Sequence, residues 1–377
     1  MKILNICSNI NENFGYHENI FPYYQSKLGN DVISVTSRVQ GLINGERHIL
    51  KEGNYSEKGI KVLRIEYAYK IGNKIIKFKN FTKILYEFKP DIIFCHGLSP
   101  INFFQLIKYK KNNKCILLFD NHADLINSAR NKIWKIFYYK IFLGTLYKKY
   151  DKYIDKYYGV TPYRIDFLVN LIGIPKEKIE LLPLGYEDDE INEIKREKFF
   201  FEKRYKIKMK ENDKVIVFGG KIDSDKKFDN VIEAFNKLNQ ENLKLIIFGK
   251  VNCEKIETMI EENENIYFLG WKESKEKYEI LINSDLAVWP EFHTTLIEDC
   301  LGSELPMLIF KNRNSEHLLR RGNGIFLNNS SVDEILDKLK IALKDKKLSI
   351  LKEKAKEAKE DFSYYNITKK FLAGIKE

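Results

Sequence analysis

The chain has 377 residues, of which 44% are hydrophobic, and a formal net charge of +11. This length predicts two domains rather than one core, and the composition excludes an intrinsically disordered chain. The longest apolar run, residues 136–147, contains Lys140 and is too short to cross a bilayer. The first ten residues alternate like a strand and do not resemble a signal peptide, so we expect a cytoplasmic protein.

Short apolar runs alternate with amphipathic stretches along the whole chain. In the first half the runs predict strands at residues 2–7, 31–37, 61–67, 91–97, 115–121 and 156–162, with a helical stretch at 73–88. In the second half they predict strands at 214–220, 243–250, 265–271, 285–290 and 305–310, separated by helical stretches such as 229–239. Strands that alternate with helices are typical of parallel sheets. We therefore expect an α/β protein with two Rossmann-like domains joined near residues 184–198.

The excess positive charge lies in the first half. Residues 1–185 contain 29 Lys and Arg against 16 Asp and Glu, so the rest of the chain is close to neutral. This asymmetry indicates an anionic partner for the first half, either a membrane surface, a phosphorylated acceptor or nucleic acid. Ordinary solvated lysines are the alternative. The five cysteines are scattered singly, which predicts buried free thiols instead of disulfides or a zinc site.

Polar residues follow the predicted strands of the first half: Gly15, His17, Glu18, His96, Asp120, His122 and Asp124. The last three could form a metal triad, but no distant fourth ligand is apparent. A lone histidine at a strand end usually completes hydrogen bonds, and His17 and Glu18 could belong to a solvated helix start.

Residues 130–158 mix aromatic side chains with eight Lys and Arg. A core helix with snorkelling lysines, a membrane-surface contact and a site for single-stranded nucleic acid are all compatible with this pattern.

The loop after the first strand of the second half indicates a diphosphate site, because ligands of open parallel sheets bind beyond the carboxyl ends of the strands. Gly219 and Gly220 allow a tight turn, Lys221 and Lys226 supply cations, and a predicted helix N-terminus follows. The loop has neither a P-loop nor a GxGxxG fingerprint. A plain strand end is the alternative.

The segment 289–308 places three acids around a predicted helix start. Thr295 and Glu298 fit a capping box, which would make Glu298 structural, while the amides of Thr295 and Leu296 could meet a phosphate. Glu291 would end the strand, and Asp299 would lie in the first helical turn. The two acids could bind the hydroxyls of a sugar and a ribose, or they could be ordinary solvated acids.

Motifs along essentially the whole chain resemble, in order, those of retaining GT-B glycosyltransferases of family 4. Glu291 and Asp299, followed by Pro306, resemble the E-x7-E…G-x-P signature, and residues 219–235 resemble the glycine–lysine loop. Residues 173–187 resemble the interdomain segment, and residues 1–37 resemble the first βα unit.

This resemblance implies GT-B architecture, with two Rossmann-like domains facing each other across a cleft. Residues 1–185 would bind the acceptor, and residues 186–360 would bind the nucleotide sugar. Residues 361–377 would form a helix that packs back on the N-terminal domain.

The resemblance also implies a hexosyltransferase-type enzyme that is retaining and independent of metals and other cofactors. The donor would be a nucleotide-diphosphate sugar, with a UDP-sugar favoured, and the acceptor would be a saccharide or a lipid-linked molecule. The expected setting is bacterial surface polysaccharide or glycolipid synthesis, in the cytoplasm or at the inner face of the plasma membrane, without a nucleic-acid partner. A nucleotide-sugar epimerase of the same architecture, or a non-catalytic basic protein that binds membrane or nucleic acid, is the alternative.

Carried over by position, the resemblance implies four sets of residues. The catalytic residues would be Glu291, His122 and Lys226. The diphosphate would be bound by Gly15, Gly220, Lys221, Lys226, Thr294, Thr295 and Leu296. The nucleoside would be bound by Asp299, Gly270 and Trp271. The acceptor would be bound by His17, Glu18, His96 and Asp124.

Three positions depart from the family pattern. Lys221 stands where Arg is usual and cannot form a bidentate fork, Asp299 replaces Glu, and Glu304 replaces Gly. If Asp299 is too short to reach the ribose, the neighbouring Glu298 would take its role.

Overall fold

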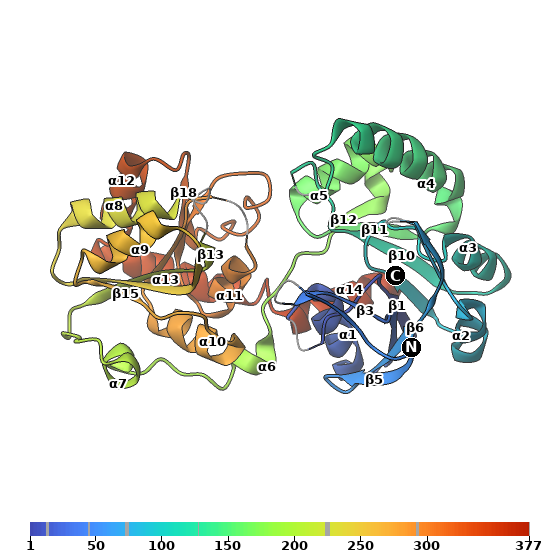
Figure 1. Ribbon diagram of the computed structural model, residues 1–377, viewed down its shortest axis with the longest axis horizontal. Coiled ribbons are helices and arrows are strands. Elements are labelled where there is room, and N and C mark those ends of the chain that lie inside the picture. Colours follow the sequence, from blue (N-terminus) through green and yellow to red (C-terminus); the bar gives the residue numbers. More distant parts are fainter. Residues whose placement is uncertain are drawn as a thin grey trace. The chain divides into compact units, whose positions relative to one another are not determined.

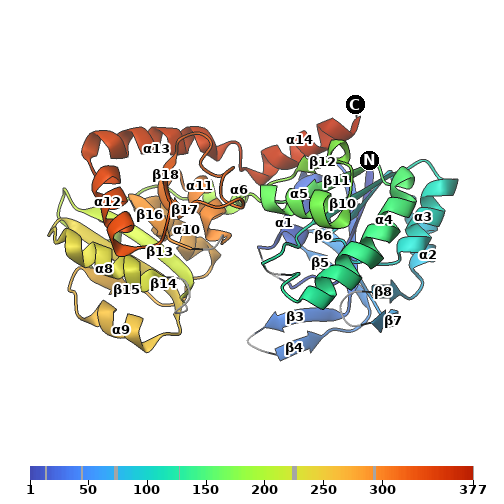
Figure 2. The ribbon, with the colours of Figure 1, turned by 90° about the horizontal axis from the view of Figure 1, so that it is seen from above.

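A computed structural model gives the fold and describes residues 1–12, 15–43, 46–71, 75–126, 128–222, 227–291 and 294–376. The chain forms two compact units (Figures 1 and 2), Met1–Pro183 with Ile367–Glu377, and Leu184–Asn366. Each unit has its own open sheet and its own buried core. The predicted succession of two α/β units is confirmed.

The first unit is built on an eight-stranded sheet. Its strands follow the order β12 (Ile179–Leu181), β11 (Lys156–Gly159), β10 (Ile116–Asn121), β9 (Ile92–Cys95), β1 (Lys2–Ile6), β2 (Asp31–Ser37), β6 (Ile60–Ile65) and β5 (Gly53–Glu57). All neighbours are parallel except β5 and β6. The six strands predicted for this half are confirmed, because strands buried on both faces of a parallel sheet are almost continuously apolar.

Strand β1 lies between β2 and β9 in this sheet. The chain therefore extends the sheet first in one direction, through β2 and β6, and then in the other, through β9 to β12. Such a reversal is a topological switch point, where ligands of open α/β sheets usually bind.

Two antiparallel hairpins also belong to this unit, β3 (Val39–Ile43) with β4 (Glu46–Ile49), and β7 (Tyr67–Ile71) with β8 (Ile75–Phe78). The prediction of a helix over residues 73–88 is therefore wrong in its first half, and helix α2 begins at Phe81. Ile76 and Phe78 are buried while Ile75 and Lys77 are only partly so, which is the period of a strand.

The helices of the first unit are α1 (His17–Lys27), α2 (Phe81–Phe88), α3 (Phe103–Asn112), η1 (Trp134–Leu143), α4 (Gly144–Tyr150), η2 (Asp151–Tyr153), α5 (Pro162–Phe167), η3 (Leu168–Ile172), η4 (Lys176–Lys178) and the end of α14 (Tyr364–Lys376). The C-terminal helix contributes Phe371, whose ring lies 5.0 Å from that of Phe21 and 5.3 Å from those of Phe94 and Tyr158.

The second unit has a six-stranded parallel sheet. Its order is β15 (Ile266–Phe268), β14 (Leu243–Val251), β13 (Lys214–Ile222), β16 (Leu286–Trp289), β17 (Met307–Phe310) and β18 (Gly324–Leu327). The switch point lies between β13 and β16, and the five strands predicted here are confirmed. The helices are α6 (Asp188–Ile191), α7 (Phe200–Tyr205), α8 (Phe228–Leu238), α9 (Glu254–Glu261), α10 (Ser274–Asn283), α11 (Leu296–Gly302), α12 (Val332–Ala342) and α13 (Asp345–Lys359).

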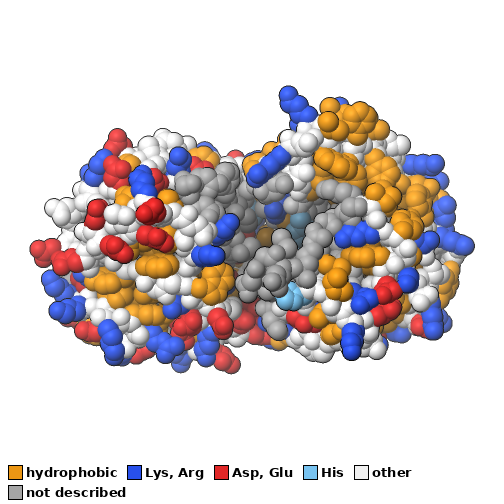
Figure 3. Space-filling model, viewed as in Figure 1, with side chains coloured by type: hydrophobic (Ala, Val, Ile, Leu, Met, Phe, Trp, Pro, Cys, Tyr) orange, Lys and Arg blue, Asp and Glu red, His pale blue; other side chains and the backbone are white. Residues whose placement is uncertain are grey.

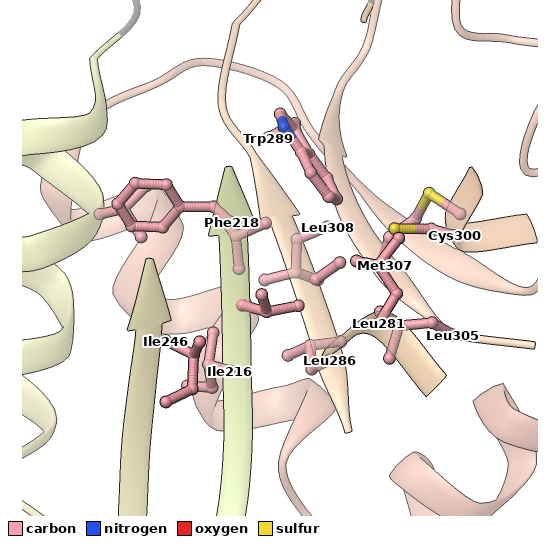
Figure 4. Packing of buried hydrophobic residues seen from close by; sticks show 14 of the residues in the cluster. Ile216, Phe218, Ile246, Leu281, Leu286, Trp289, Cys300, Leu305, Met307 and Leu308 are labelled. Carbon is pink, nitrogen blue, oxygen red and sulfur yellow. The ribbon is translucent and has the colours of Figure 1, made fainter. Parts of the chain in front are cut away.

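The core of the second unit fills both sides of its central strands. Figure 4 shows Ile216, Leu286 and Leu308 packed together across three neighbouring strands. The ring of Phe218 stacks on Phe228 of α8, with centroids 4.5 Å apart. This packing fixes the positions at which the loops leave the carboxyl edge of the sheet.

All five cysteines are free, and all but Cys253 are buried, as predicted. Among the described residues, no helix combines the length and apolarity needed to cross a membrane.

Candidate functional site

Three glycines lie together at the carboxyl edge of the second sheet. Gly220 of β13 pairs with Gly249 of β14, and the N–H of Gly249 donates to the carbonyl of Gly270 over 2.8 Å. A Cβ on Gly249, where φ is +120°, would lie 2.0 Å from the carbonyl oxygen of Gly220. Only glycine fits this position, so the two strand ends meet backbone against backbone. Gly249 was not predicted as a site residue, although it lies third from the end of β14 as Gly220 does in β13.

The glycine edge also touches the start of helix α11. A Cβ on Gly220, where φ is +103°, would lie 3.1 Å from Cδ1 of Leu296. The structure therefore brings together Gly220, Gly270 and Leu296, which were assigned to one ligand from separate motifs. Thr294 and Thr295 lead directly into Leu296, and Lys221 is exposed beside Gly220. Trp271 follows Gly270 and is 71% exposed.

Lys226 lies outside the described residues. Its assignment to the diphosphate therefore stays a prediction.

The predicted capping box at the start of α11 is wrong in its hydrogen bond. Thr295 is the N-cap residue, as predicted, but its side chain accepts no capping hydrogen bond. Its backbone is already helical, with φ −62° and ψ −16°, whereas a capping residue is normally extended. Glu298 is buried, with 1% exposure. The hydroxyl of Thr295 is thus not committed to the helix.

Asp299 is held by two neighbours on α10. Its Oδ1 accepts a 2.6 Å hydrogen bond from the Tyr278 hydroxyl, and its Oδ2 lies 2.7 Å from Nζ of Lys277. Burial, and then the negative charge of Asp299, raise the pKa of Tyr278, so the phenol stays a donor. Two of the roughly four acceptor sites of the carboxylate are occupied, and the others can accept from a ligand. No local pattern marks Lys277 and Tyr278, because Tyr278 and Asp299 are 21 positions apart.

Glu291 follows β16 and is positioned by Ser330. The Ser330 hydroxyl donates to Oε1 of Glu291 over 2.8 Å and also contacts the carbonyl of Pro290. The carboxylate is half-buried at the same sheet edge. Ser330 is 39 positions away and was not predicted from the sequence.

A second group of side chains gathers at the switch point of the first sheet. Asp120, at the end of β10, is fully buried, and three histidines surround its Oδ2. Nδ1 of His96 lies 2.9 Å away, Nε2 of His122 3.1 Å and Nε2 of His17 3.7 Å. The loops after β1, β9 and β10 thus converge on one carboxylate, which the sequence indicated only as a possible member of a metal triad.

Further hydrogen bonds orient this group. The N–H of Gly97 donates to Oδ1 of Asp120 over 2.6 Å. Nε2 of His96 lies 3.3 Å from Oδ1 of Asn5, whose amide donates to Gln25 over 2.7 Å. Only His122 keeps substantial exposure, 34% of its side chain, and so faces outward.

Burial and charge act in opposite directions in this group. Burial would raise the pKa of Asp120, but His122 and His96 hold it well below its usual value. Burial would lower the pKa of His122, but the carboxylate of Asp120 outweighs this and raises it. For His17 burial dominates and lowers the pKa well below its usual value. The arrangement therefore places a proton donor, His122, on the exposed side of a buried anion.

The same four side chains could hold a metal ion, since one ligand atom of each lies within 4.8 Å of all the others. Imidazole and carboxylate groups of this kind suit Zn²⁺. The metal triad considered from the sequence is not formed, because Asp124 lies outside this group. Its Oδ2 is 3.6 Å from Nε of Arg164, and its Oδ1 accepts from the N–H of Ile126.

The remaining candidates of the first unit occupy the loop and helix that follow β1. Gly15 is exposed, and a Cβ there would meet nothing within 4 Å. Glu18 is half-buried in the first turn of α1, next to His17.

Comparisons with known proteins give a family match for part of the chain and a likeness in fold. Residues 199–361 match the family model described as Glycosyl transferases group 1, and no curated relative matches the chain. A glycosyltransferase from Rickettsia africae superposes with a TM-score of 0.68 at 16% identity, covering 99% of this chain and 97% of that one. Anabaena Alr3699/HepE in complex with UDP gives 0.68 at 13% identity, covering 100% of both chains.

A third structure, a Listeria monocytogenes protein provisionally named a UDP-N-acetylglucosamine 2-epimerase, gives a TM-score of 0.60 at 13% identity over 100% of this chain and 95% of that one. At these identities the likeness shows the fold. The chain has the two Rossmann-like domains of the GT-B architecture, and residues 199–361, in its second unit, match group 1 glycosyl transferases.

Proposed function

We propose that the protein is a retaining glycosyltransferase that moves a hexose from a nucleotide-diphosphate sugar, preferably a UDP-sugar, to a saccharide or lipid-linked acceptor. Bacterial surface polysaccharide or glycolipid synthesis is the proposed setting. The match to group 1 glycosyl transferases supports the reaction class. The likeness to Anabaena HepE, solved with UDP and with UDP-glucose, supports the choice of donor.

The observation that carries the proposal is the convergence of Gly220, Gly249, Gly270 and Leu296 at one sheet edge. Glycines at strand ends let a bulky phosphate approach the backbone closely. The exposed cation of Lys221 lies beside them and would offset the charge of the leaving diphosphate.

The acids beside this edge would bind the hydroxyls of the two sugars of the donor. Asp299, held by Lys277 and Tyr278, would accept hydrogen bonds from the ribose hydroxyls. Glu291, held by Ser330, would accept from hydroxyls of the transferred sugar. In the first unit, His122 would donate to the reacting sugar, with Asp120 supporting the charged form of its ring.

Thermal unfolding of the full chain with UDP, GDP, CMP, NAD and UDP-sugars tests the donor site. A ligand at a hundred times its Kd adds about 2.7 kcal/mol, which raises the Tm by roughly a few degrees. We expect UDP and UDP-sugars to raise the Tm and Lys221→Ala to reduce that rise. Lys340→Ala, an exposed lysine on α12, is the matched control and should keep it. No rise with any nucleotide would overturn the donor site.

Product analysis distinguishes transfer from the epimerase alternative. Donor turnover without an acceptor would favour an epimerase, whereas transfer with retention at the anomeric carbon, seen by NMR, supports the proposal. Because the proposed reaction uses no metal, dialysis against a chelator should leave its rate unchanged. A loss that Zn²⁺ restores would instead assign a metal to Asp120 and its three histidines.

A further inference from the structure

One helix of the first unit presents large apolar side chains outward. Helix η1 (Trp134–Leu143) runs directly into α4 (Gly144–Tyr150). The inner face of the two helices is buried and includes Tyr138, Tyr139 and Leu143 of η1 and Tyr147 of α4. The exposed apolar residues of η1, with Ile133 just before it, are named here the 133–142 face: Ile133, Trp134, Ile136, Phe137, Ile141 and Phe142, which are 66%, 52%, 47%, 64%, 51% and 39% exposed. A surface helix normally exposes polar residues to solvent. A helix that is apolar on both sides is therefore expected to contact an apolar environment on its outer side as well.

The apolar surface continues onto neighbouring elements. Phe142 and Leu146 line a hollow together with Phe104 of α3 and Tyr69 of β7. Phe104 is 64% exposed and Tyr69 52%. Figure 3 shows hydrophobic side chains gathered over the part of the first unit where Figure 1 draws α4, with Lys and Arg side chains at their border. A contiguous exposed patch of this kind marks a contact with another apolar phase.

The charged residues along the chain segment that carries the 133–142 face all have one sign. Between residues 125 and 150 the chain has six cations and no acid; the cations are Arg130, Lys132, Lys135, Lys140, Lys148 and Lys149. None of the five lysines forms an ion pair with a carboxylate in the described part of the chain. A partner that covers this face must therefore be both apolar and anionic.

We infer that the 133–142 face docks the protein on an anionic lipid bilayer, with the helix lying in the interface. The isoleucines and aromatic rings would enter the boundary between headgroups and acyl chains, and the lysines would pair with headgroup phosphates. Three of the six apolar residues are isoleucines, which bury well in lipid but have no ring on which a nucleic-acid base could stack. The composition thus favours lipid over single-stranded nucleic acid.

This inference goes beyond the proposed donor chemistry. Where it rests on the proposed function, it narrows the acceptor to a lipid-linked molecule. The bilayer contact itself uses no residue assigned to the donor, so a vesicle experiment and a nucleotide experiment fail independently.

Flotation of the full chain with vesicles tests the inference. We expect binding to vesicles of phosphatidylcholine with phosphatidylglycerol, weaker binding at high salt, and little binding to phosphatidylcholine alone. Changing Lys132, Lys135 and Lys140 to Gln should weaken binding by about fivefold for each lysine removed. The variant W134S/F137S/I141S should weaken it at least about tenfold.

Matched controls separate docking from damage to the fold. The variant I341S/I350S removes exposed isoleucines from α12 and α13, which are 41% and 42% exposed, and should bind vesicles like the wild type. Both triple variants should keep the Tm rise with UDP. Absence of vesicle binding by the wild type would overturn the inference, and so would binding that the W134S/F137S/I141S variant leaves intact. Binding of single-stranded RNA without vesicle binding would assign the face to nucleic acid instead.

Discussion

Two buried aspartates, one in each unit, show how similar local structures serve different ends. Asp120 accepts a backbone N–H from Gly97 at 2.6 Å, and Asp285 accepts one from Val215 at 2.8 Å. Both carboxylates are almost fully buried, and both have a lowered pKa because nearby cationic groups outweigh burial. They differ in their partners and in their position on the sheet.

Asp285 precedes β16, at the amino end of its strand. Its Oδ1 lies 2.6 Å from both Arg196 and Lys352, which stay charged at neutral pH. Asp120 lies at the carboxyl end of β10, next to the strands of the switch point, and is surrounded by histidines, whose protonation can change during a reaction. Permanent charges at the amino edge indicate a structural pair, and titratable partners at the carboxyl edge indicate chemistry.

Removing Asp285 should give the largest effect on stability. In Asp285→Ala, two cations and the N–H of Val215 lose their shared acceptor, and the free energy of unfolding should fall by about 3 kcal/mol. Urea unfolding measures this change. Asp345→Ala is the control, because Asp345 pairs with Lys214 at 2.6 Å on the surface. The urea midpoint of this variant should hardly change. Equal midpoints for the two variants would contradict the structural role of Asp285.

Asp120→Asn should lower the rate of sugar transfer more than it lowers stability. The amide keeps the shape of the carboxylate but withdraws the charge that supports the protonated ring of His122, so we expect about a hundredfold slower sugar transfer. Initial rates with the donor identified by unfolding measure it. Asp91→Asn is the control, since Asp91 accepts the N–H of Lys2 at the opposite end of the same sheet. If the transfer rate falls equally in both variants, the loss in Asp120→Asn comes from impaired folding.

Much of the fold could be predicted because the strands of both sheets are buried on two faces, which leaves apolar runs such as 243–250 and 305–310. The hairpins could not, since short half-exposed strands such as β8 resemble the beginning of an amphipathic helix.

The candidate site was also predictable only in part. Glycines and acids at strand ends are visible in the sequence, whereas Tyr278, Lys277 and Ser330 act across long separations that no local pattern reveals. Asp120 was visible beside His122, but its three histidines come together only through the topology of the sheet.

The pH dependence of stability should also report on Asp285. Because the pKa of Asp285 is lowered from 3.8 in the folded chain, its contribution is present above about pH 4 and is lost as the pH falls through the folded pKa. Urea midpoints between about pH 5 and pH 3 should therefore fall more steeply for the wild type than for Asp285→Asn. Parallel curves would show that Asp285 does not titrate in this range.

The smallest effect concerns two helix starts of the second unit. The hydroxyl of Ser331 accepts from the N–H of Glu334 and caps α12, whereas Thr295 occupies the same position of α11 without capping it. Ser331→Ala should lower the free energy of unfolding by about 1 kcal/mol, and Thr295→Ala by only a few tenths. If Thr295 instead serves a ligand, as we propose from its position next to Leu296 at the glycine edge, Thr295→Ala should reduce the Tm rise with UDP, and Ser331→Ala should not. If Thr295→Ala and Ser331→Ala lose the same stability, Thr295 caps its helix and does not serve a ligand. The carboxyl edge of the second sheet would then resemble an ordinary strand end more closely than its glycines indicate.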